Sequence, residues 1–353
     1  GTPKQVNAAH VDEIAKAAEG CELIVNVMPL EFGVNVMQAA LQIKACYQDL
    51  SACENVVEGF PEYDTWLEGI RYMYTEYGRR FAENGTTAII GTGSAPGVMC
   101  VMARKAVNEL DECDTIACMV YEGTRTKRFI HFFWSPEVAL CDMEEDAYAF
   151  ENCQQIRTKP FSRPIKRNWP ECGREVTLVE HAHDEPVYIG FNREKYFKGC
   201  KNAYFKYGGT GIEFSEGLYK AGLLHHTPEE FEGHEIVPFD WVLKHIPMPP
   251  KDPAFVCEAY GKKDGKDIMV DLHVSSPGLE EAYERAKMTG EMYLTGQGAF
   301  LYTKLLVNDM VPQKGLISSD MLDDQQVEQY IAWANDLGIT YTIDIKEGCK
   351  FDG

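Results

Sequence analysis

The chain has 353 residues, more than one simple hydrophobic core usually contains, so two domains are expected. Hydrophobic residues make up 45% and charged residues 25%, an ordinary balance for a globular protein in water. The net charge of -21 excludes a basic face that neutralises phosphates, so no nucleic-acid partner is expected.

Twelve cysteines are scattered singly between Cys21 and Cys349, and no C-x-x-C pair occurs. This spacing predicts reduced and mostly buried thiols rather than a zinc site or a disulfide framework. No apolar run reaches the ~20 residues that span a bilayer, and no signal-peptide pattern is found. We therefore expect a cytoplasmic protein with no membrane partner.

The first part of the chain alternates helical and strand patterns. Helices are predicted at residues 11–18, 34–43, 65–83 and 98–110, and strands at residues 21–27, 45–50 and 86–90. The strand patterns are nearly continuous apolar runs, which are typical of parallel strands covered on both faces. This order, with right-handed crossovers, predicts an α/β fold with a doubly wound parallel sheet.

From about Asp114 the pattern changes to shorter elements and loops that contain proline. Strands are predicted at residues 115–122, 176–181, 202–207, 254–260 and 266–274, and helices at 215–221, 238–246, 290–307 and 324–337. The strands predict a second, mixed or antiparallel sheet, and the last two helices are expected to return to the first domain. The predicted domains are 1–120 with 290–345, and an inserted α+β domain at 121–289.

A glycine-rich turn, Gly91–Gly97, stands between a predicted strand and a predicted helix. Gly91 and Gly93 permit a tight turn, and Pro96 suits the first turn of a helix. The spacing is G-x-G-x-x-x-G, one residue longer than the dinucleotide fingerprint G-x-G-x-x-G. We expect this turn to contact a small ligand rather than a pyrophosphate; a simple strand-to-helix connection is the alternative.

No strand, G-x-G-x-x-G turn and helix stand before residue 11, where a doubly wound nucleotide-binding sheet normally begins. The predicted sheet therefore lacks its first βαβ unit. Three explanations stay open: the chain is truncated or processed, the unit is a separate polypeptide, or ligand binding has been lost. The first two are favoured, because the polar start Gly1-Thr2-Pro3 suits a break in a surface loop.

Two more strand ends are expected at the same edge of the sheet, where open α/β sheets bind ligands. Asn26–Pro29 ends one strand and is expected to contribute backbone contacts and shape. Tyr47 and Asp49 share one face of the next strand, where they could orient an amine or a carboxamide. The alternative for Asp49 is a cap on the following segment beside Ser51.

The second domain contains the sequence His181-Ala182-His183-Asp184-Glu185. Alternate histidines of a strand would face the same side, but no third ligand follows at a metal-binding spacing, so no metal is expected. Instead, His183, Asp184 or Glu185 is expected to bind a substrate ammonium group or to transfer a proton. Structural polar contacts are the alternative.

Three further charged positions have a functional and a structural interpretation. Arg125, with Lys127 and Arg128, could hold a carboxylate in a bidentate manner, or could belong to a salt-bridged loop. Glu137 could hold an amine or cap a helix. Lys206 could assist proton transfer, but an exposed strand lysine is the favoured interpretation.

In their order along the chain, these motifs resemble the saccharopine dehydrogenase-like family, which includes saccharopine reductases, lysine 6-dehydrogenases and carboxynorspermidine synthases. The matching stretches are residues 23–29, 45–50, 85–97, 182–185, 205–208 and 289–315. The resemblance covers nearly the whole chain and implies a Rossmann-type domain that binds NADP or NAD, joined to a substrate and dimerisation domain, with the substrate enclosed between them.

The resemblance implies hydride transfer at a carbon that bears nitrogen, and it places three groups of residues in the site. Cofactor contacts are expected from Asn26, Val27, Met28, Pro29, Gly91 and Gly93. Substrate contacts are expected from Ser94, Ala95, Pro96, Gly97, Arg125 and Glu137. Catalytic roles are expected for His183, Glu185 and Asp49.

The implied substrate is an amino acid or a polyamine: lysine first, saccharopine second, and a carboxynorspermidine-like polyamine third. Ala95-Pro96-Gly97 is similar to the lysine 6-dehydrogenases, whereas the other two groups tend to carry Asp-Pro-Gly. A homodimer is the default expectation. Full activity is expected to need the missing unit, and a separate chain that supplies it is a further expected partner; a chain inactive by itself is the alternative.

Overall fold

The computed structural model describes residues 1–52, 65–124, 136–245 and 251–352. The chain folds into two compact units. One contains Gly1–Val101 and Thr295–Trp333, and the other contains Met102–Leu294 and Ala334–Gly353. Both units are discontinuous, because the chain leaves the first unit within one helix and returns to it within another. The binding roles assigned to the two predicted domains stay predictions.

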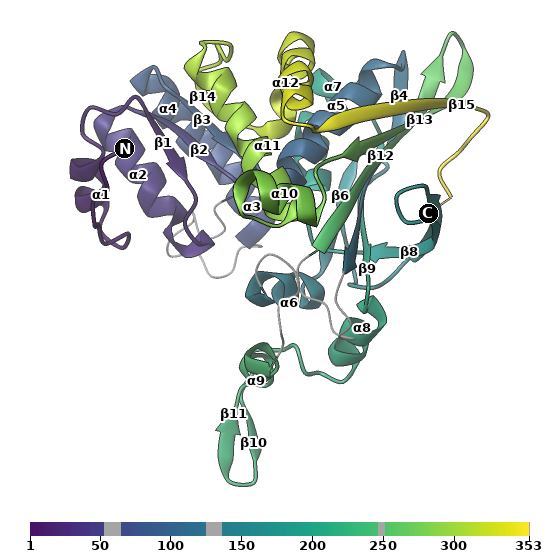
Figure 1. Cartoon of the computed structure of the whole chain (residues 1–353), viewed down its shortest axis with the longest axis horizontal. Coiled ribbons are helices and arrows are strands. Elements are labelled where there is room, and N and C mark those ends of the chain that lie inside the picture. The colour runs from purple at the N-terminus through teal and green to yellow at the C-terminus, as the bar shows by residue number, and fades with distance from the viewer. Residues whose placement is uncertain (53–64, 125–135, 246–250, 353) are drawn as a thin grey trace. The chain divides into compact units, whose positions relative to one another are not determined.

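A four-stranded parallel sheet organises the first unit, in the order β1-β2-β3-β14 (Figure 1). Its strands are β1 (Leu23–Asn26), β2 (Cys46–Asp49), β3 (Thr87–Ile90) and β14 (Gly315–Ser318). Every residue of β3 and β14 is buried, as expected of parallel strands that are covered on both faces. Parallel neighbours need long crossover connections, and helices supply them here.

The helices that belong wholly or partly to the first unit follow the predicted pattern closely. They are α1 (Val11–Ala17), α2 (Gly33–Ile43), α3 (Thr65–Tyr72), α4 (Gly78–Asn84), α5 (Met99–Asn108), α11 (Gly290–Val307) and α12 (Asp324–Asp336). The helix predicted at residues 65–83 is not continuous, because a π-helical turn at Met73–Tyr77 separates α3 from α4. A second π-helical turn, Ser94–Val98, precedes α5, and 3-10 turns lie at Leu30–Phe32 and Ser319–Met321.

A nine-stranded mixed sheet organises the second unit. Its strands are β4 (Glu112–Thr124), β5 (Ala147–Glu151), β6 (Gln154–Thr158), β7 (Ile165–Trp169), β8 (Arg174–Glu180), β9 (Asn202–Gly209), β12 (Lys251–Lys263), β13 (Lys266–Ser275) and β15 (Thr340–Glu347). The main path runs β15-β13-β12-β4-β9-β5-β6, and β8 pairs with β7 and β9. Only β4 and β9 are parallel among the described pairs. The predicted combination of a parallel sheet and a mixed sheet is confirmed.

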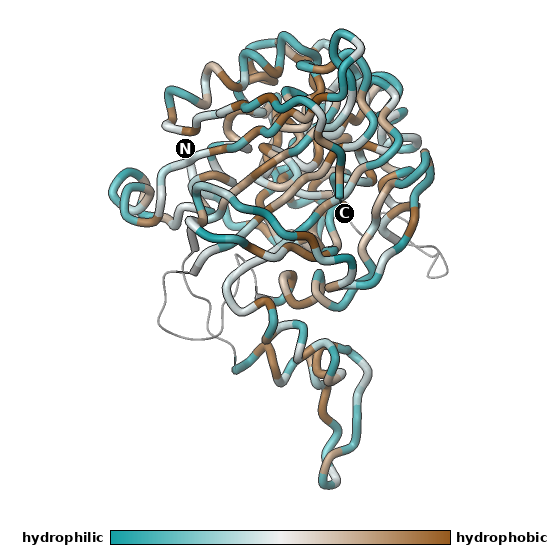
Figure 2. The backbone as a smooth tube through the Cα atoms, turned by 90° about the vertical axis from the view of Figure 1, so that its right-hand side faces the viewer, coloured by the Kyte–Doolittle hydropathy of each residue, from teal (hydrophilic) through white to brown (hydrophobic). Residues whose placement is uncertain are grey.

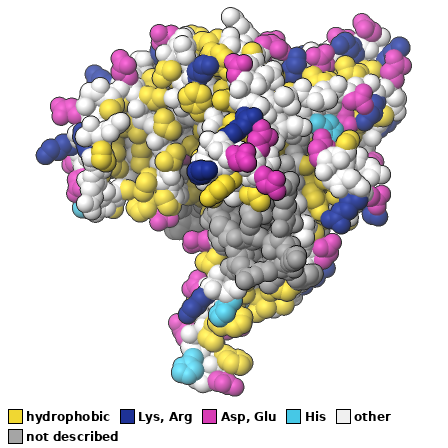
Figure 3. Space-filling view, viewed as in Figure 1, with side chains coloured by type: hydrophobic (Ala, Val, Ile, Leu, Met, Phe, Trp, Pro, Cys, Tyr) yellow, Lys and Arg dark blue, Asp and Glu magenta, His cyan; other side chains and the backbone are white. Residues whose placement is uncertain are grey.

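Short helices and one projecting hairpin complete the second unit. The helices are α6 (Pro136–Glu144), α7 (Glu185–Tyr196), α8 (Ile212–Lys220), α9 (Pro238–His245) and α10 (Leu279–Ala286). The hairpin of β10 (Glu229–Phe231) and β11 (His234–Ile236) projects away from the mixed sheet in Figures 1 and 2. Phe231 is 62% exposed, and hydrophobic side chains are visible on this arm in Figure 3.

The strand predicted at residues 176–181 ends one residue early, and this changes the interpretation of the histidines beside it. β8 ends at Glu180, and α7 begins at Glu185, where Pro186 suits the first helical turn. His181 and His183 therefore lie in the irregular connection rather than at alternate positions of a strand. The prediction that strand alternation places them on one side is wrong.

Candidate functional site

Three strand ends meet at the carboxyl edge of the parallel sheet. Asn26 is the last residue of β1 and is paired in register with Asp49, the last residue of β2. Gly91 follows the end of β3 directly. The carboxyl edge of an open parallel sheet is where such folds bind ligands. The structure therefore brings together the expected cofactor residues of the first unit.

A closed cluster of polar side chains joins the first two strand ends. Asn26 Nδ2 donates to Asp49 Oδ2 at 2.9 Å and to Tyr47 Oη at 3.2 Å. Tyr47 Oη donates to the same oxygen of Asp49, and all three residues are buried. The Met28 N–H donates to Asn26 Oδ1 at 3.1 Å, which turns the chain as it leaves β1. Because Asp49 accepts hydrogen bonds from two neighbouring side chains, it is better suited to stabilising this edge of the sheet than to transferring a proton.

Apolar side chains lie exposed immediately after β1. Val27 is 73% exposed and Met28 is 45% exposed, and Pro29 is exposed as well. Exposed apolar atoms beside a ligand-binding edge offer a surface to a flat, weakly polar ring. The expected contact of Val27, Met28 and Pro29 with a nicotinamide stays a prediction.

The backbone of the glycine turn is already hydrogen-bonded. The N–H groups of Gly91–Gly93 donate to carbonyl groups of residues 49–51, at N···O distances of 3.0–3.1 Å. Thr92 Oγ1 adds a bond to the carbonyl of Asp49 at 2.7 Å. Backbone N–H groups bind phosphate only when they are unpaired. These three are consumed by the fold, so the residues present do not fit a pyrophosphate at this turn.

Close packing explains two of the glycines. A Cβ on Gly97 would lie 2.5 Å from the carbonyl carbon of Thr92, and one on Gly93 would lie 3.2 Å from the carbonyl oxygen of Leu50. Both neighbours are backbone atoms, which cannot move aside independently. Of the expected substrate contacts in this turn, Ser94, Pro96 and Gly97 are buried, and Ala95 alone is partly exposed.

The second unit holds a histidine and a carboxylate in direct contact. His183 Nδ1 is hydrogen-bonded to a carboxylate oxygen of Glu185, whose side chain is fully buried. The His183 ring stacks on Phe205 of β9, with the ring centroids 4.0 Å apart. Burial lowers the pKa of His183, but the charge and hydrogen bond of Glu185 outweigh it and raise the pKa to about 9. The imidazole is therefore protonated at neutral pH.

One oxygen of this dyad has no partner. Glu185 Oε1 is buried, and no donor reaches it within the described residues. An unsatisfied buried carboxylate oxygen is costly, by about 1–3 kcal/mol or more for a charged group. The arrangement can accept an N–H group from a ligand without losing an internal bond.

Further ring and carboxylate groups lie beside the dyad on β4 and β9. The ring of His181 lies 4.6 Å from that of Tyr207, whose hydroxyl donates to Glu122 Oε2 at 2.7 Å. Burial, together with the charge of Glu122, raises the pKa of Tyr207 well above its usual range. Tyr207 therefore stays a neutral hydroxyl that donates to a carboxylate.

Comparison with known proteins places this geometry in context. The chain is 28% identical to the carboxynorspermidine synthase of Vibrio alginolyticus over 342 residues, which are 91% of this chain and 78% of that protein. It is 27% identical to the carboxynorspermidine synthase of Vibrio cholerae, over 83% of this chain and 71% of that protein. No known family profile matches the sequence.

The fold has a counterpart among solved structures. The apo saccharopine dehydrogenase (L-Glu forming) of Saccharomyces cerevisiae matches 98% of this chain and 88% of its own, with a TM-score of 0.68 and 11% identity. That likeness shows the fold, and the sequence relatives agree with it. These findings support the resemblance to the saccharopine dehydrogenase-like family. The parallel unit of the chain is accordingly a Rossmann-type sheet.

Lys206 lies in the second unit, and its interpretation as an exposed strand lysine is wrong. Its side chain is fully buried, and Nζ donates to Glu180 Oε1 at 2.6 Å and to the Arg163 carbonyl at 2.8 Å. Burial lowers the pKa of Lys206, although the charge of Glu180 opposes this. The run Ala203-Tyr204-Phe205 directly before Lys206 contains no charged residue and covers both strand faces, and such a run predicts a strand buried on both faces.

Two expected substrate contacts add little to the site. Arg125 lies in residues 125–135, outside the described residues. Glu137 is exposed in the first turn of α6, where a negative charge suits a helix N-terminus.

No group of three metal-binding side chains is found in the described ranges. Among the residues that the structure describes, every helix is too short or too polar to cross a membrane.

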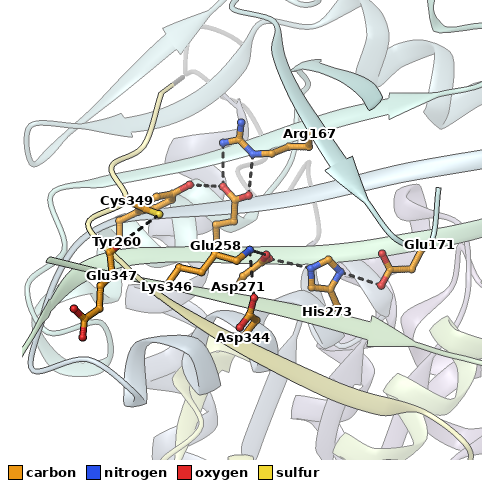
Figure 4. A network of polar contacts seen from close by, with 10 residues as sticks. All are labelled: Arg167, Glu171, Glu258, Tyr260, Asp271, His273, Asp344, Lys346, Glu347 and Cys349. Atoms are coloured by element: carbon orange, nitrogen blue, oxygen red, sulfur yellow. Dashed lines mark hydrogen bonds and ion pairs between the residues drawn. The ribbon is translucent and has the colours of Figure 1, made fainter. Parts of the chain in front are cut away.

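A separate polar network lies on β7, β12, β13 and β15 (Figure 4). Arg167 donates twice to Glu258, at 2.8 and 3.0 Å. His273 bridges Asp271 and Glu171, at 3.0 and 2.9 Å. The network borders an open hollow of about 270 Å³. Apart from Glu347, which pairs with Lys266, the cations and carboxylates in Figure 4 are paired with one another, so the network serves to join strands.

Proposed function

We propose that this chain is an NAD(P)-dependent oxidoreductase that reduces an imine to a secondary amine. In this reaction an aldehyde that carries a carboxylate condenses with a primary amine, releasing water. The similarity to the Vibrio alginolyticus carboxynorspermidine synthase over 91% of the chain carries the proposal. It moves the polyamine product, third in order from the sequence motifs, ahead of lysine and saccharopine.

The parallel unit would hold the nicotinamide end of the cofactor. When bound, that group supplies the hydride that reduces the imine carbon. Val27 and Met28 would pack against it, and Asn26 and Asp49 would keep this edge in shape. Because the Gly91–Gly93 N–H groups are already paired, the cofactor phosphates would be held by other residues.

The dyad of the second unit would supply the proton. Because Nδ1 of His183 faces Glu185, the proton available to a substrate is on Nε2. Transfer of this proton to the imine nitrogen makes the imine carbon more electrophilic. Glu185 would stabilise the charged imidazole and offer its second oxygen to an N–H group of the amine.

Oxidation of an amino-acid amine is the second candidate. The turn Ala95-Pro96-Gly97 is similar to that of the lysine 6-dehydrogenases, and hydride transfer then runs in the opposite direction. His183 would have to lose its proton first, so the rate of this reaction would rise with pH through the raised pKa of His183, about 9. The choice between NADP and NAD, the amino-acid substrate and the homodimer stay predictions.

Two measurements test the proposal. The full-length protein is titrated with NADH and NADPH, and binding is followed by nicotinamide fluorescence. Loss of NAD(P)H is then followed with carboxylated aldehydes and diamines, and formation of NAD(P)H with lysine and saccharopine. Consumption that requires both the aldehyde and the diamine supports the proposal. Cofactor binding with turnover of lysine or saccharopine alone supports the second candidate, and no cofactor binding excludes both.

A further inference from the structure

A buried ion pair lies where β8 ends and the segment that carries His183 begins. β8 and β9 are paired at only two positions, Val179 with Tyr207 and Glu180 with Lys206. The second of these is the last pair before the connection to α7. Few ladder hydrogen bonds therefore hold this strand end against β9.

The two side-chain faces of β9 have different tasks. Lys206 reaches Glu180 on one face, while Phe205, the adjacent residue, supports the His183 ring on the other face. Two consecutive residues of β9 therefore hold the two parts of the segment: Lys206 holds the strand end at Glu180, and Phe205 holds the imidazole of His183. A shift of the chain at Glu180 would be transmitted to His183, three residues later.

Glu180 is held from several directions. Its carboxylate accepts from Lys206 and Thr158, at 2.6 and 3.2 Å, and is 3.1 Å from the Arg163 guanidinium. Its backbone N–H and carbonyl are both bonded to residues 161–162. A buried pair with this many contacts has one available geometry.

We infer that the Glu180–Lys206 pair is a positioning element for the His183 imidazole, and this inference rests on the proposed role of His183 as the proton donor. Within the described residues, neither residue of the pair is hydrogen-bonded or ion-paired to the imidazole. They act through the placement of the segment 181–184, which brings His183 onto Phe205 and against Glu185.

The pKa of His183 reports where its imidazole lies, because neighbouring carboxylates raise this pKa. Charged groups from two helices raise its pKa: Glu185 and Asp184 from the start of α7, and Asp142 from α6. The neighbouring rings are Phe205 on β9 and His181 in the same connection. Because Coulomb interactions fall with distance, an imidazole that moves away from Glu185 loses most of the shift.

The test is the pKa of His183, measured by NMR in the full-length protein without cofactor or substrate, and assigned with a His183→Gln variant. We expect Lys206→Met to lower this pKa by at least about one unit. Glu180→Gln keeps an oxygen that accepts from Lys206, so it is expected to retain most of the shift.

A matched control distinguishes positioning from general stability. Glu258→Gln weakens another buried pair of the same sheet, Arg167–Glu258, and none of the contacts of that pair within the described residues involves His183. This variant is expected to lower the thermal midpoint and leave the His183 pKa unchanged. The double variant Glu180→Leu with Lys206→Met removes both charges, so that it folds even where Lys206→Met alone does not.

The pKa of His183 in these variants distinguishes a positioning role of the Glu180–Lys206 pair from a general contribution to stability. A lowered His183 pKa in the folded Lys206 variants, with an unchanged value in Glu258→Gln, supports the inference. An unchanged His183 pKa in either folded Lys206 variant, or an equal fall in the control, overturns it. An inactive enzyme with these same pKa values would contradict the proposed function and leave the positioning role supported.

Discussion

The carboxyl edge of the parallel sheet and the histidine dyad of the mixed sheet are built by opposite means. At the edge, backbone hydrogen bonds and glycines determine the shape, and an added methyl group at Gly97 has nowhere to go. At the dyad, the attraction between the charged imidazole of His183 and the Glu185 carboxylate holds the geometry, so the geometry depends on the protonation state of His183. The first region should therefore respond to changes in volume, and the second to changes in charge and pH.

Removal of the charge at the dyad should have the largest effect. His183→Gln keeps a polar side chain but cannot transfer a proton, so kcat/KM for imine reduction is expected to fall about 10²–10⁴-fold. Steady-state kinetics at saturating cofactor measure this loss. The control is His234→Gln in the exposed β10–β11 hairpin, which should leave the rate unchanged. Equal rates for His183→Gln and the wild type would exclude His183 as the proton donor.

An added methyl group in the glycine turn should come next. Gly97→Ala places Cβ against the Thr92 backbone, so the free energy of unfolding is expected to fall by about 3 kcal/mol, with a loss of cofactor affinity. Chemical denaturation and the NAD(P)H titration measure these changes. Gly296→Ala, in an open position of α11, should be neutral or stabilising by about 1 kcal/mol. A neutral Gly97→Ala variant would show that the turn adapts.

The stabilising effect of His183 should depend on pH. Its folded-state pKa is raised from 6.5 to about 9, so the stabilisation is complete below about pH 6.5 and is lost as the pH rises through about 9. Since a fifth of the side chain is exposed, the expected size is on the order of 2 kcal/mol. The difference in unfolding free energy between wild type and His183→Gln measures it. A difference that stays constant from pH 6 to 10 would contradict the shift.

A charge change at the parallel edge should have the smallest effect. Asp49→Asn preserves volume but replaces an oxygen that accepts from Asn26 and Tyr47, and a loss of about 1 kcal/mol of stability is expected. Denaturant titration at neutral pH is the measurement, and the exposed Asp309→Asn is the control. A loss larger than that of Gly97→Ala would show that the edge also depends on charge.

The first unit could be predicted from the sequence because its elements are determined locally. The strand ends at Asn26, Asp49 and Ile90 follow from short apolar runs between helical patterns. The glycine turn was recognisable from its spacing. β14 cannot be predicted in this way, because its four residues have no amphipathic pattern and their burial depends on pairing with β3, more than two hundred residues away.

The second unit was predicted less well because its elements depend on partners distant in sequence. β5, β6, β7 and β15 are amphipathic only in part, and the sequence predicts none of them, whereas β8 corresponds to the strand predicted at residues 176–181. Lys206 is buried only because Glu180 lies opposite it in the sheet. Residue type alone predicts an exposed lysine, and no pattern in one sequence reveals a compensating charge on another strand.

The projecting hairpin has a practical consequence for handling the protein. Within β10 and β11 every residue is exposed except Ile236, which is half-buried, and the hairpin carries Glu229, Glu230, Glu232 and Glu235. Exposed loop tips are the preferred sites of proteolytic nicking. A glutamate-specific protease should therefore cleave the hairpin before it cleaves either sheet. β9 precedes the cleavage site in the sequence and β12 follows it, and both strands belong to the mixed sheet. The two fragments should therefore remain associated.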